Sequence, residues 1–454
     1  MGRRPAYAPL RVYLNNRRVG TLRREASGAI SFTYHEDWLG WNYALPVSLS
    51  LPLRETPYRG EPVAAVFENL LPDSDKLRRL VAEKVRARGT DAYSLLARIG
   101  QDCVGALQFI AGDDAAPDST GKLVGEPVDE ATIEKILNGL SQAPLGLSSG
   151  DAFRISVAGA QEKTALLYHD NGWIKPHGTT PTTHIIKTQI GQLPGGIDLS
   201  DSVENEYYCL KLTEAFGLPV NTATIANFGD TKALVIERFD RRWTKDGRLL
   251  RLPQEDCCQA LSVPPTLKYQ NEGGPGMVDV LDLLKGSDTP IEDQETFLKA
   301  QLIFWLIGAT DGHAKNFSVF LSPGGSYRMT PLYDILTAQP ALNARQVERK
   351  QMKMAMSAGN NRHYRFDRIH GRHFMQTARR AGLSKNQALK LIENVATMAP
   401  DALDAVAAGL PEGFPPAIHE MIRDVVTERL RGLEIPDTSA VKLPPPSPPS
   451  RFMP

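Results

Sequence analysis

Alternating hydrophobic and polar positions predict a β-rich unit at the start of the chain, followed by helices. Strands are predicted at 11–14, 18–22, 30–34 and 46–53. The pair Asn15-Asn16 between the first two strands is typical of a hairpin turn. Apolar residues at helical spacing then predict helices at 64–71 and 75–88, with a break at Pro72. The segment 67–73 is interpreted as a packed helix end rather than a site.

The middle of the chain mixes both periods, and its end is helical. A polar connection at 111–125 precedes a predicted helix at 130–140 and an amphipathic helix at 203–216. Strands are predicted at 153–157, 164–168, 183–188 and 233–239. Further helices are predicted at 278–284, 293–306, 372–381, 385–398, 401–408 and 417–433. The Pro-rich tail at 437–454 cannot form a packed core and is predicted to be disordered.

Composition narrows the class of protein. The 454 residues suit two or three domains, and 42% hydrophobic with 23% charged residues is ordinary for a globular protein. The 52 basic and 52 acidic residues cancel, which argues against strong nucleic-acid binding by this chain alone. No apolar run is long enough to cross a bilayer and no signal peptide precedes the first strand, so a cytoplasmic protein without membrane contact is expected. The four scattered cysteines are expected to be reduced and buried.

One polar segment carries the strongest chemical signal. Asp311 stands five residues before Asn316, and Asp334 follows 18 residues later, each after an apolar run. Phosphoryl transfer from ATP needs a carboxylate to orient a hydroxyl, and an amide and a carboxylate to hold Mg²⁺. The protein-kinase catalytic loop has the same offset of five from Asp to Asn. A capped turn after a buried helix explains the spacing equally well on this segment alone.

Two further segments are weaker by themselves. The small residues Ala158-Gly159-Ala160 between two predicted strands form a tight turn whose amides can approach phosphates. A hairpin that uses glycine for backbone reasons is the simpler explanation. Lys187 ends a strand-like run, where kinases place a phosphate-binding lysine, but a solvated edge lysine fits the pattern too.

These stretches together closely resemble the HipA family of bacterial toxin serine/threonine kinases. The resemblance spans roughly residues 8–435, in order and at family spacing. The blocks that carry it are 154–167, 179–187, 203–209, 237–243, 251–256, 273–276, 305–319 and 330–334. The segment 343–365 matches the family weakly. Unlike ordinary protein kinases, the chain has Ala309-Thr310 before Asp311 and no glycine directly after Asp334.

The resemblance implies an α+β, bilobal protein-kinase-like fold with a β-rich N-terminal subdomain and an all-helical C-terminal lobe. It divides the chain into an N-terminal subdomain at 1–110, a nucleotide-binding part at 111–245, a helical lobe with the catalytic loop at 246–436 and the tail at 437–454.

The resemblance also implies roles for individual residues. Asp311 would be the catalytic base, Asn316 and Asp334 would hold Mg²⁺, and His313 would shape the loop or contact nucleotide. Lys187 would contact the ATP phosphates, and Glu206 is a candidate partner for it. The residues implied to cover the nucleotide or to contact adenine are Ala158, Gly159, Ala160, Gln161, Glu162, Lys163, Glu237 and Phe239.

Ser156 has a special place in this resemblance. In the family, the serine of this motif is autophosphorylated, and that inactivates the kinase. A phosphate adds nearly two negative charges, here beside the loop expected to wrap the phosphates of ATP. Repulsion, or capture of the phosphate by Arg154, would pull the loop away. Without the family, a plain hydroxyl in a strand is the favoured interpretation of Ser156.

The expected function is therefore an ATP- and Mg²⁺-dependent serine/threonine kinase that acts as the toxin of a toxin–antitoxin pair. The resemblance implies a small HipB-like helix-turn-helix antitoxin as partner, operator DNA bound mainly through that antitoxin, and glutamyl-tRNA synthetase as protein substrate. Phosphorylation of that substrate would arrest growth and produce drug tolerance. The alternatives are a small-molecule phosphotransferase with the same core and a catalytically inactive co-repressor scaffold.

Overall fold

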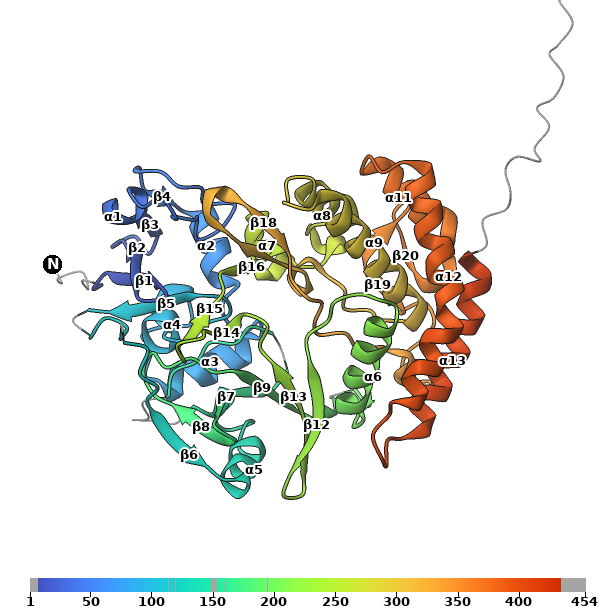
Figure 1. Ribbon diagram of the computed structural model, residues 1–454, viewed down its shortest axis with the longest axis horizontal. Coiled ribbons are helices and arrows are strands. Elements are labelled where there is room, and N and C mark those ends of the chain that lie inside the picture. The colour runs from blue at the N-terminus through green and yellow to red at the C-terminus, as the bar shows by residue number, and fades with distance from the viewer. Residues whose placement is uncertain are drawn as a thin grey trace, which may run out of the picture.

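The computed structural model describes residues 7–112, 114–118, 120–147, 153–159, 161–193 and 195–433. Ala160 and the tail at 437–454, which figure in the predictions above, lie outside these residues. The N-terminal strands lie at one side of the molecule and the long C-terminal helices at the other, with the strands around residues 163–237 between them (Figure 1). This mixture of helices and sheets confirms the α+β part of the predicted fold class.

The N-terminal part is built on a five-stranded antiparallel sheet with the strand order β4-β3-β2-β1-β5. Its strands are β1 (Leu10–Leu14), β2 (Arg17–Arg24), β3 (Ile30–Tyr34), β4 (Tyr58–Arg59) and β5 (Leu107–Ala111). Its helices are α1 (Glu36–Leu39), α2 (Glu61–Glu68), α3 (Asp75–Lys84) and α4 (Ala92–Ile99). Asn15 and Asn16 take φ values of 42° and 73°, as a tight hairpin turn requires, so the predicted hairpin is confirmed.

The predicted strand at 46–53 is wrong. The Val47 amide donates to the Tyr34 hydroxyl at 2.9 Å, and the Leu49 amide donates to Glu255 Oε1 at 2.7 Å. The Tyr34 hydroxyl in turn donates to the Leu51 carbonyl. Side chains, one of them 206 residues away, therefore satisfy backbone groups that a neighbouring strand would otherwise bind.

The central sheet has six strands in the order β12-β13-β9-β7-β8-β6. Its strands are β6 (Gly125–Val128), β7 (Lys163–His169), β8 (Gly172–Pro176), β9 (His184–Thr188), β12 (Ala223–Phe228) and β13 (Thr231–Glu237). Around it lie α5 (Glu130–Asn138), α6 (Ser202–Ala215), β10 (Gly191–Gln192), β11 (Asp198–Leu199), β14 (Arg241–Trp243) and β15 (Leu249–Arg251). The antiparallel pairing of β7 with β9 sets Lys163 opposite Lys187, so two predicted site lysines are neighbours.

The predicted strand at 153–157 is also wrong, and with it the hairpin that joined it to β7. The Ser156 amide donates to the Asp102 carbonyl at 2.9 Å, and the Ser156 hydroxyl donates to the Leu70 carbonyl at 2.7 Å. The segment therefore packs against the N-terminal part instead of pairing within the central sheet.

The C-terminal lobe is mainly helical. Its helices are α7 (Cys257–Ala260), α8 (Met277–Leu284), α9 (Pro290–Ile307), α10 (Gln339–Asn343), α11 (Gly371–Arg380), α12 (Lys385–Ala408) and α13 (Pro416–Leu430). It also carries β16 (Gln254–Asp256), β17 (Ser318–Leu321), β18 (Tyr327–Met329), β19 (Lys353–Ala358) and β20 (His363–Arg365), which corrects the expectation of an all-helical lobe. Short 3₁₀ turns are η1 (Pro144–Gly146), η2 (Pro265–Leu267), η3 (Gln270–Glu272), η4 (Ala314–Asn316), η5 (Pro323–Gly325), η6 (Phe366–Arg368) and η7 (Arg431–Leu433).

The two helices predicted at 385–398 and 401–408 form the single helix α12, with Pro400 inside it. A proline inside a helix removes one backbone hydrogen bond and usually ends the helix. Here Ala399, Ala402 and Leu403 beside it are buried, and α12 packs against α6, α9, α11 and α13. Tertiary packing on one face therefore keeps the helix continuous.

Helix α9 is the centre of the lobe and leads directly to the candidate site. Almost all of its side chains from Phe297 to Ile307 are buried, and Gly308 ends it with a φ of 79°.

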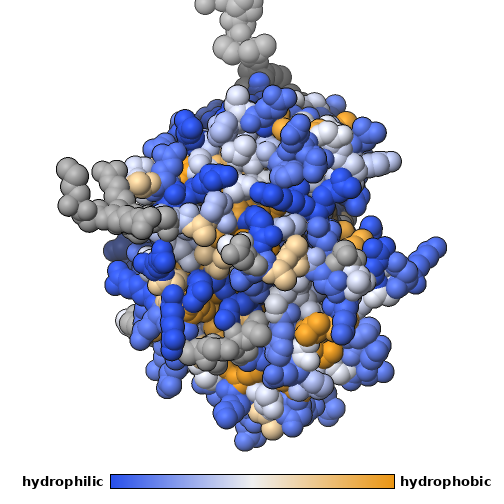
Figure 2. Space-filling view, turned by 90° about the vertical axis from the view of Figure 1, so that its left-hand side faces the viewer, coloured by the Kyte–Doolittle hydropathy of each residue, from blue (hydrophilic) through white to orange (hydrophobic). Residues whose placement is uncertain are grey.

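None of the helices in the described ranges combines the length and the apolar character needed to span a membrane. The face in Figure 2 is mostly hydrophilic, with small separate apolar patches.

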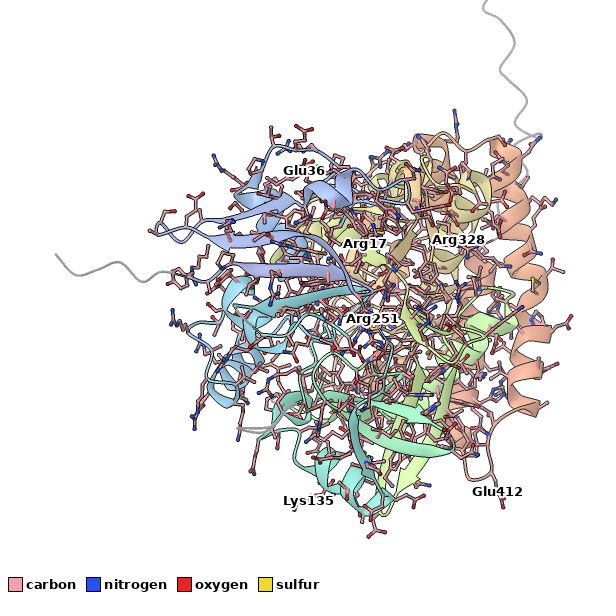
Figure 3. The ribbon with its side chains drawn as sticks, turned by 60° about the vertical axis from the view of Figure 1, so that its left-hand side comes forward. Arg17, Glu36, Lys135, Arg251, Arg328 and Glu412 are labelled. Carbon is pink, nitrogen blue, oxygen red and sulfur yellow. The ribbon has the colours of Figure 1, made fainter. Side chains whose placement is uncertain are left out.

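A buried charge cluster joins the N-terminal part to the central sheet. Asp102 follows α4, and the guanidinium groups of Arg238, Arg241 and Arg251 surround it at 2.8–3.5 Å. Asp240 accepts from Arg238 at 2.8 Å. Figure 3 shows Arg251 near the middle of the molecule, close to the N-terminal strands.

Candidate active site

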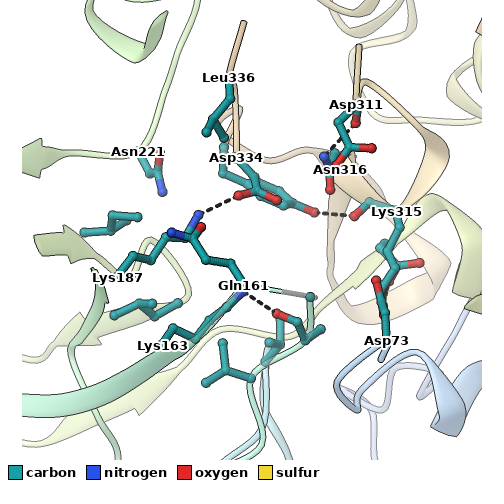
Figure 4. Close-up of a pocket in the computed structure, with 18 of the residues that line it drawn as sticks. Asp73, Gln161, Lys163, Lys187, Asn221, Asp311, Lys315, Asn316, Asp334 and Leu336 are labelled. Carbon is teal, nitrogen blue, oxygen red and sulfur yellow. Dashed lines mark hydrogen bonds and ion pairs between the residues drawn. The ribbon is translucent and has the colours of Figure 1, made fainter. Parts of the chain in front are cut away.

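A cavity of about 620 Å³ lies where the three parts of the molecule meet. Asp73 reaches it from the N-terminal part, Lys163 and Lys187 from the central sheet, and Asp311 and Asp334 from the C-terminal lobe (Figure 4). Its size and its few convergent polar groups are those of a small-molecule site.

The loop after α9 places Asp311 and Asn316 together at the cavity. The Asn316 side-chain amide donates to the Asp311 carbonyl at 2.8 Å, and the His313 amide donates to the same carbonyl. A Cβ at Gly312 would lie 2.5 Å from the ring of Phe304, so only glycine fits this close approach to α9. The Asp311 side chain keeps 49% of its surface exposed, which leaves its carboxylate accessible from the cavity.

Lys187 holds the second carboxylate of the predicted metal pair. Its ammonium donates to Asp334 Oδ1 at 2.5 Å and to Glu206 Oε1 at 2.7 Å, so the suggested pairing with Glu206 is present. Burial alone raises the pKa of the Asp334 carboxyl, but Lys187 and Lys163 outweigh it and hold that pKa well below its usual range. Asp334 is therefore ionised at neutral pH, and its φ of 59° is a conformation uncommon outside glycine.

Gly159 and Lys163 form one unit at the edge of the cavity. Gly159 has a φ of 110°, and a Cβ there would lie 2.5 Å from Lys163 Nζ. The Lys163 ammonium donates to the Ala158 carbonyl at 2.8 Å, and the Gln161 side chain donates to the Thr188 carbonyl at 2.9 Å. Burial, together with the nearby charge of Lys187, lowers the pKa of Lys163 to about 8. The Lys163 ammonium, held next to backbone groups that no side chain covers, could bind an anionic ligand.

Of the remaining residues predicted to contact the nucleotide, all but one are found at the cavity. Ala158, Glu162, Glu237 and Phe239 line the cavity, with the Phe239 ring 5.7 Å from that of Tyr333. Ala160 lies outside the described residues.

His313 lines the cavity but makes no hydrogen bond through its buried ring nitrogens to any described residue. Its Nε2 lies 3.6 Å from Asp311 Oδ1. Burial lowers the pKa of this imidazole, against the opposing effect of Asp311, so it is neutral at pH 7. A neutral ring beside the carboxylate fits a residue that shapes the loop.

Ser156 is fully buried and does not line the cavity. Its hydroxyl is held by the Leu70 carbonyl. In this conformation the hydroxyl is not presented to Asp311.

Sequence reasoning missed one group of site residues. Asn69 and Asp73 line the cavity, which corrects the interpretation of 67–73 as only a packed helix end. Lys268 Nζ lies 2.8 Å from Asp73 Oδ2, and Lys315 Nζ lies 3.2 Å from both Asn69 Oδ1 and Asp256 Oδ2. No local signal marks these residues, because each contact joins segments at least 59 residues apart.

The described oxygen donors fit Mg²⁺ held together with a nucleotide. Asp334 offers its second carboxylate oxygen, and Asn316 keeps its amide oxygen because its NH₂ group makes the bond to Asp311. Mg²⁺ is bound in such enzymes by one or two protein oxygens plus substrate phosphates. The described residues contain no group of three or more His, Cys, Asp or Glu that could hold a metal ion.

Comparison with known proteins identifies the family. The HipA N-terminal domain matches residues 10–110, and the HipA-like C-terminal domain matches residues 155–403. The chain belongs to the HipA family. The predicted boundaries at 110, 245 and 436 stay predictions.

Two curated relatives carry kinase names. Y4mE of Sinorhizobium fredii, named as a kinase, is 37% identical over 356 residues, which cover 77% of this chain and 80% of that protein. The serine/threonine-protein kinase toxin HipA of Shewanella oneidensis is 28% identical over 342 residues, 72% of this chain and 75% of that protein. These relatives support kinase activity for this HipA-family chain.

A solved structure supports the fold. Shewanella oneidensis HipA, in a complex with HipB and its operator DNA, matches with a TM-score of 0.77 over 93% of this chain and 97% of that chain. The two sequences are 24% identical in this comparison, so the match shows a common HipA fold.

Proposed function

We propose that this protein is an ATP- and Mg²⁺-dependent serine/threonine protein kinase that acts as the toxin of a toxin–antitoxin pair. The observation that carries the proposal is the ion pair of Lys187 with Glu206 and Asp334, on the cavity that also holds Asp311 and Asn316. A scaffold protein has no need of this set. Phosphoryl transfer does, because its catalysis is almost entirely positioning and electrostatic stabilisation.

Each residue has a distinct part in the proposed reaction. Asp311 orients the serine hydroxyl of the substrate and accepts its proton as the oxygen bonds to phosphorus. Asp334 and Asn316 supply the oxygens for Mg²⁺, which neutralises charge on the ATP phosphates. Lys187 and Lys163 bind those phosphates.

A HipB-like helix-turn-helix antitoxin is the proposed partner. The Shewanella HipA was solved together with HipB and operator DNA, which supports the same kind of assembly here. Because this chain has 52 basic and 52 acidic residues, the antitoxin would supply most of the DNA affinity.

The proposed substrate is glutamyl-tRNA synthetase in the cytoplasm, with growth arrest and persistence as the result. This assignment rests on the family alone. Purified glutamyl-tRNA synthetase incubated with the Ser156→Ala kinase and labelled ATP would gain label on serine. Another aminoacyl-tRNA synthetase in a parallel reaction is the specificity control, and equal labelling of both would reject the assignment.

Autophosphorylation of Ser156 is the proposed switch. The Ser156 hydroxyl is buried against the Leu70 carbonyl, so a phosphate there has no room and no solvation. The segment 153–159 must leave its place for the reaction, and the phosphate then prevents its return. Because Ala158 and Gly159 of this segment line the cavity, its departure would remove part of the nucleotide site.

Intact mass after incubation with Mg-ATP tests both the kinase and the switch. Phosphatase-treated wild type should gain the mass of one phosphate, and Ser156→Ala and Asp311→Ala should gain none. Ser94→Ala, a buried serine in α4 away from the cavity, should behave as wild type.

Each outcome has a separate meaning. Phosphate on Ser156→Ala would keep the kinase and reject the switch. Phosphate on a folded Asp311→Ala would reject the assigned base. No phosphate on wild type, with no transfer to a protein substrate, would favour a small-molecule phosphotransferase or an inactive scaffold.

A further inference from the structure

The catalytic loop, from Asp311 to Asn316, contains no lysine or arginine that is free to contact the reacting phosphate. Its lysine, Lys315, is only 5% exposed and is bound to Asn69 and Asp256. Lys187, 6% exposed, pairs with Glu206 and Asp334 and is assigned with Lys163 to the ATP phosphates, and neither lysine belongs to the catalytic loop. Phosphoryl transfer places negative charge on the oxygens of the moving group, and a positioned cation normally stabilises it.

Lys268 is placed to supply this cation from another segment. It lies between η2 and η3, lines the cavity, and keeps 16% of its side chain exposed. Its ammonium donates to Asp73 Oδ2 at 2.8 Å and makes no other hydrogen bond to the described residues. An ammonium has three donors, so donors remain for an anion in the cavity.

The next residue ties this segment to the catalytic carboxylate. The Tyr269 hydroxyl donates to Asp311 Oδ1, and the Tyr269 ring meets His313 edge-on at 4.9 Å. One oxygen of Asp311 is therefore held by tyrosine, while the other is left for a substrate hydroxyl. Consecutive side chains thus contact Asp73 and Asp311.

The charge state of Lys268 agrees with this placement. Burial works against its charge, but Asp73, Asp311 and Asp334 outweigh burial and raise its pKa above the usual value. The ammonium is therefore protonated at neutral pH and is not a proton donor for the reaction.

We propose that Lys268 is a catalytic residue that contacts the transferring phosphoryl group, and that Asp73 and Tyr269 are positioning residues for Lys268 and Asp311. The inference rests on the proposed kinase function. In the step, the bond from the γ-phosphorus to its bridging oxygen breaks and a bond to the serine oxygen forms. The serine proton goes to Asp311, and Lys268 stays protonated throughout.

The N-terminal part would then belong to the catalytic apparatus. Asp73 follows α2, and it is the carboxylate that fixes Lys268 of the C-terminal lobe. Asp73 Oδ1 is buried without a hydrogen bond to any described residue, and Lys315 Nζ lies 3.8 Å from it.

Binding of a transition-state analogue by Lys268→Met tests the proposal. Calorimetry with Mg-ADP, with and without aluminium fluoride, separates ground-state from transition-state contacts. Lys268→Met should bind Mg-ADP within about twofold of wild type, whereas its Mg-ADP–aluminium fluoride complex should weaken by about 10- to 100-fold. The turnover number should fall by a similar factor at unchanged KM for ATP.

Matched variants exclude a merely structural role. Lys268→Arg keeps the charge and should recover part of the loss. Lys285→Met removes a lysine of the same lobe that is 49% exposed and paired with Asp282, and should have no effect. Asp73→Asn should lower turnover less than Lys268→Met. The double variant should be no worse than Lys268→Met, because Asp73 acts through Lys268.

The outcomes are distinguishable from failure of the proposed function. If wild type shows neither Mg-ADP binding nor phosphate transfer, the kinase assignment fails. If wild type is active and Lys268→Met binds the analogue as tightly as wild type, Lys268 is not catalytic. If Lys268→Met loses its thermal transition, Lys268→Arg and Asp73→Asn decide: equal losses of Mg-ADP and analogue binding in both would overturn the proposal.

Discussion

Two buried clusters in this protein both pair carboxylates with basic side chains. They differ in whether every polar atom of the cluster has a partner within the protein. The cluster around Asp102 joins the N-terminal part to the central sheet. The cluster around Lys187 lines the cavity. Both are deep in the protein, where an unpaired charge is costly. The difference between them separates a structural network from a functional one.

Around Asp102, every carboxylate oxygen is in use. Oδ1 accepts from Arg241 at 2.8 Å and Arg251 at 2.9 Å, and Oδ2 accepts from the Thr182 hydroxyl at 2.8 Å. Burial alone raises the pKa of Asp102, but the three arginines hold it well below the usual range. Arg238, the third arginine, is only 2% exposed; Asp102 does not line the cavity, although Arg238 and Asp240 of the same cluster border it. Such a network fixes the position of two parts of the chain.

Around Lys187, several polar groups are exposed to the cavity or lack a hydrogen-bond partner among the described residues. Asp334 has one oxygen bound by Lys187, and Asp311 is half exposed. Asp73 Oδ1 and both ring nitrogens of His313 are buried without hydrogen-bond partners among the described residues. Unmet polar groups at one cavity are what a charged ligand and its metal ion would satisfy.

Breaking the structural cluster should give the largest effect on stability. Asp102→Asn leaves three buried arginines facing a neutral amide, and should cost about 3–5 kcal/mol of unfolding free energy. Urea denaturation followed by circular dichroism measures it. Asp246→Asn, which removes an exposed partner of Arg248, is the control and should change little. Unchanged stability of Asp102→Asn would mean that the network does not fix the two parts.

A substitution in the functional cluster should have the opposite effect: turnover should fall strongly, whereas stability should change little. Asp334→Asn should lower turnover by roughly 10²- to 10³-fold, because a charged metal ligand is lost, while the melting temperature changes by only a few degrees. Phosphate transfer assays and thermal melting measure the two effects. Asp282→Asn, half exposed in α8, is the matched control. Near-normal turnover of Asp334→Asn would reject its role.

The close fit of Gly159 to Lys163 should be the next most sensitive feature. Gly159→Ala adds both backbone strain and a methyl group against the Lys163 ammonium, and should weaken Mg-ADP binding by about tenfold. Gly195→Ala isolates the strain, since Gly195 has a φ of 107° and no atom within 4 Å of its added Cβ. Equal Mg-ADP affinity of the two variants would show that the contact with Lys163 is unimportant.

The smallest expected effect is a dependence of nucleotide affinity on pH. The pKa of Lys163 is lowered to about 8, so Lys163 carries its charge below pH 8 and loses it above. Mg-ADP affinity should therefore be highest below pH 8 and fall above it by at most about tenfold per pH unit. Calorimetry from pH 7 to 9 measures this slope. Lys163→Met should abolish it, and a slope that persists would assign the titration to another group.

The sequence by itself determined the long helices and several of the strands, and it pointed to the chemical class. Periodicity placed α9 and β13 correctly because their apolar faces are locally encoded, and the spacing of Asp311, Asn316 and Asp334 pointed to phosphoryl transfer. The resemblance to the HipA family, which the family comparison confirms, strengthened the weak signal at Lys187 and added the proposed switch at Ser156.

Only the tertiary structure decided which distant residues complete the cavity. The strand predicted at 46–53 is absent because a glutamate 206 residues away binds its backbone, and α12 stays continuous through Pro400 because its neighbours are buried. Asp73 and Lys268 meet across 195 residues without any local pattern. Local sequence encodes periodicity and spacing, whereas contacts between lobes depend on how the folded parts pack, and packing is where a site made of several segments is assembled.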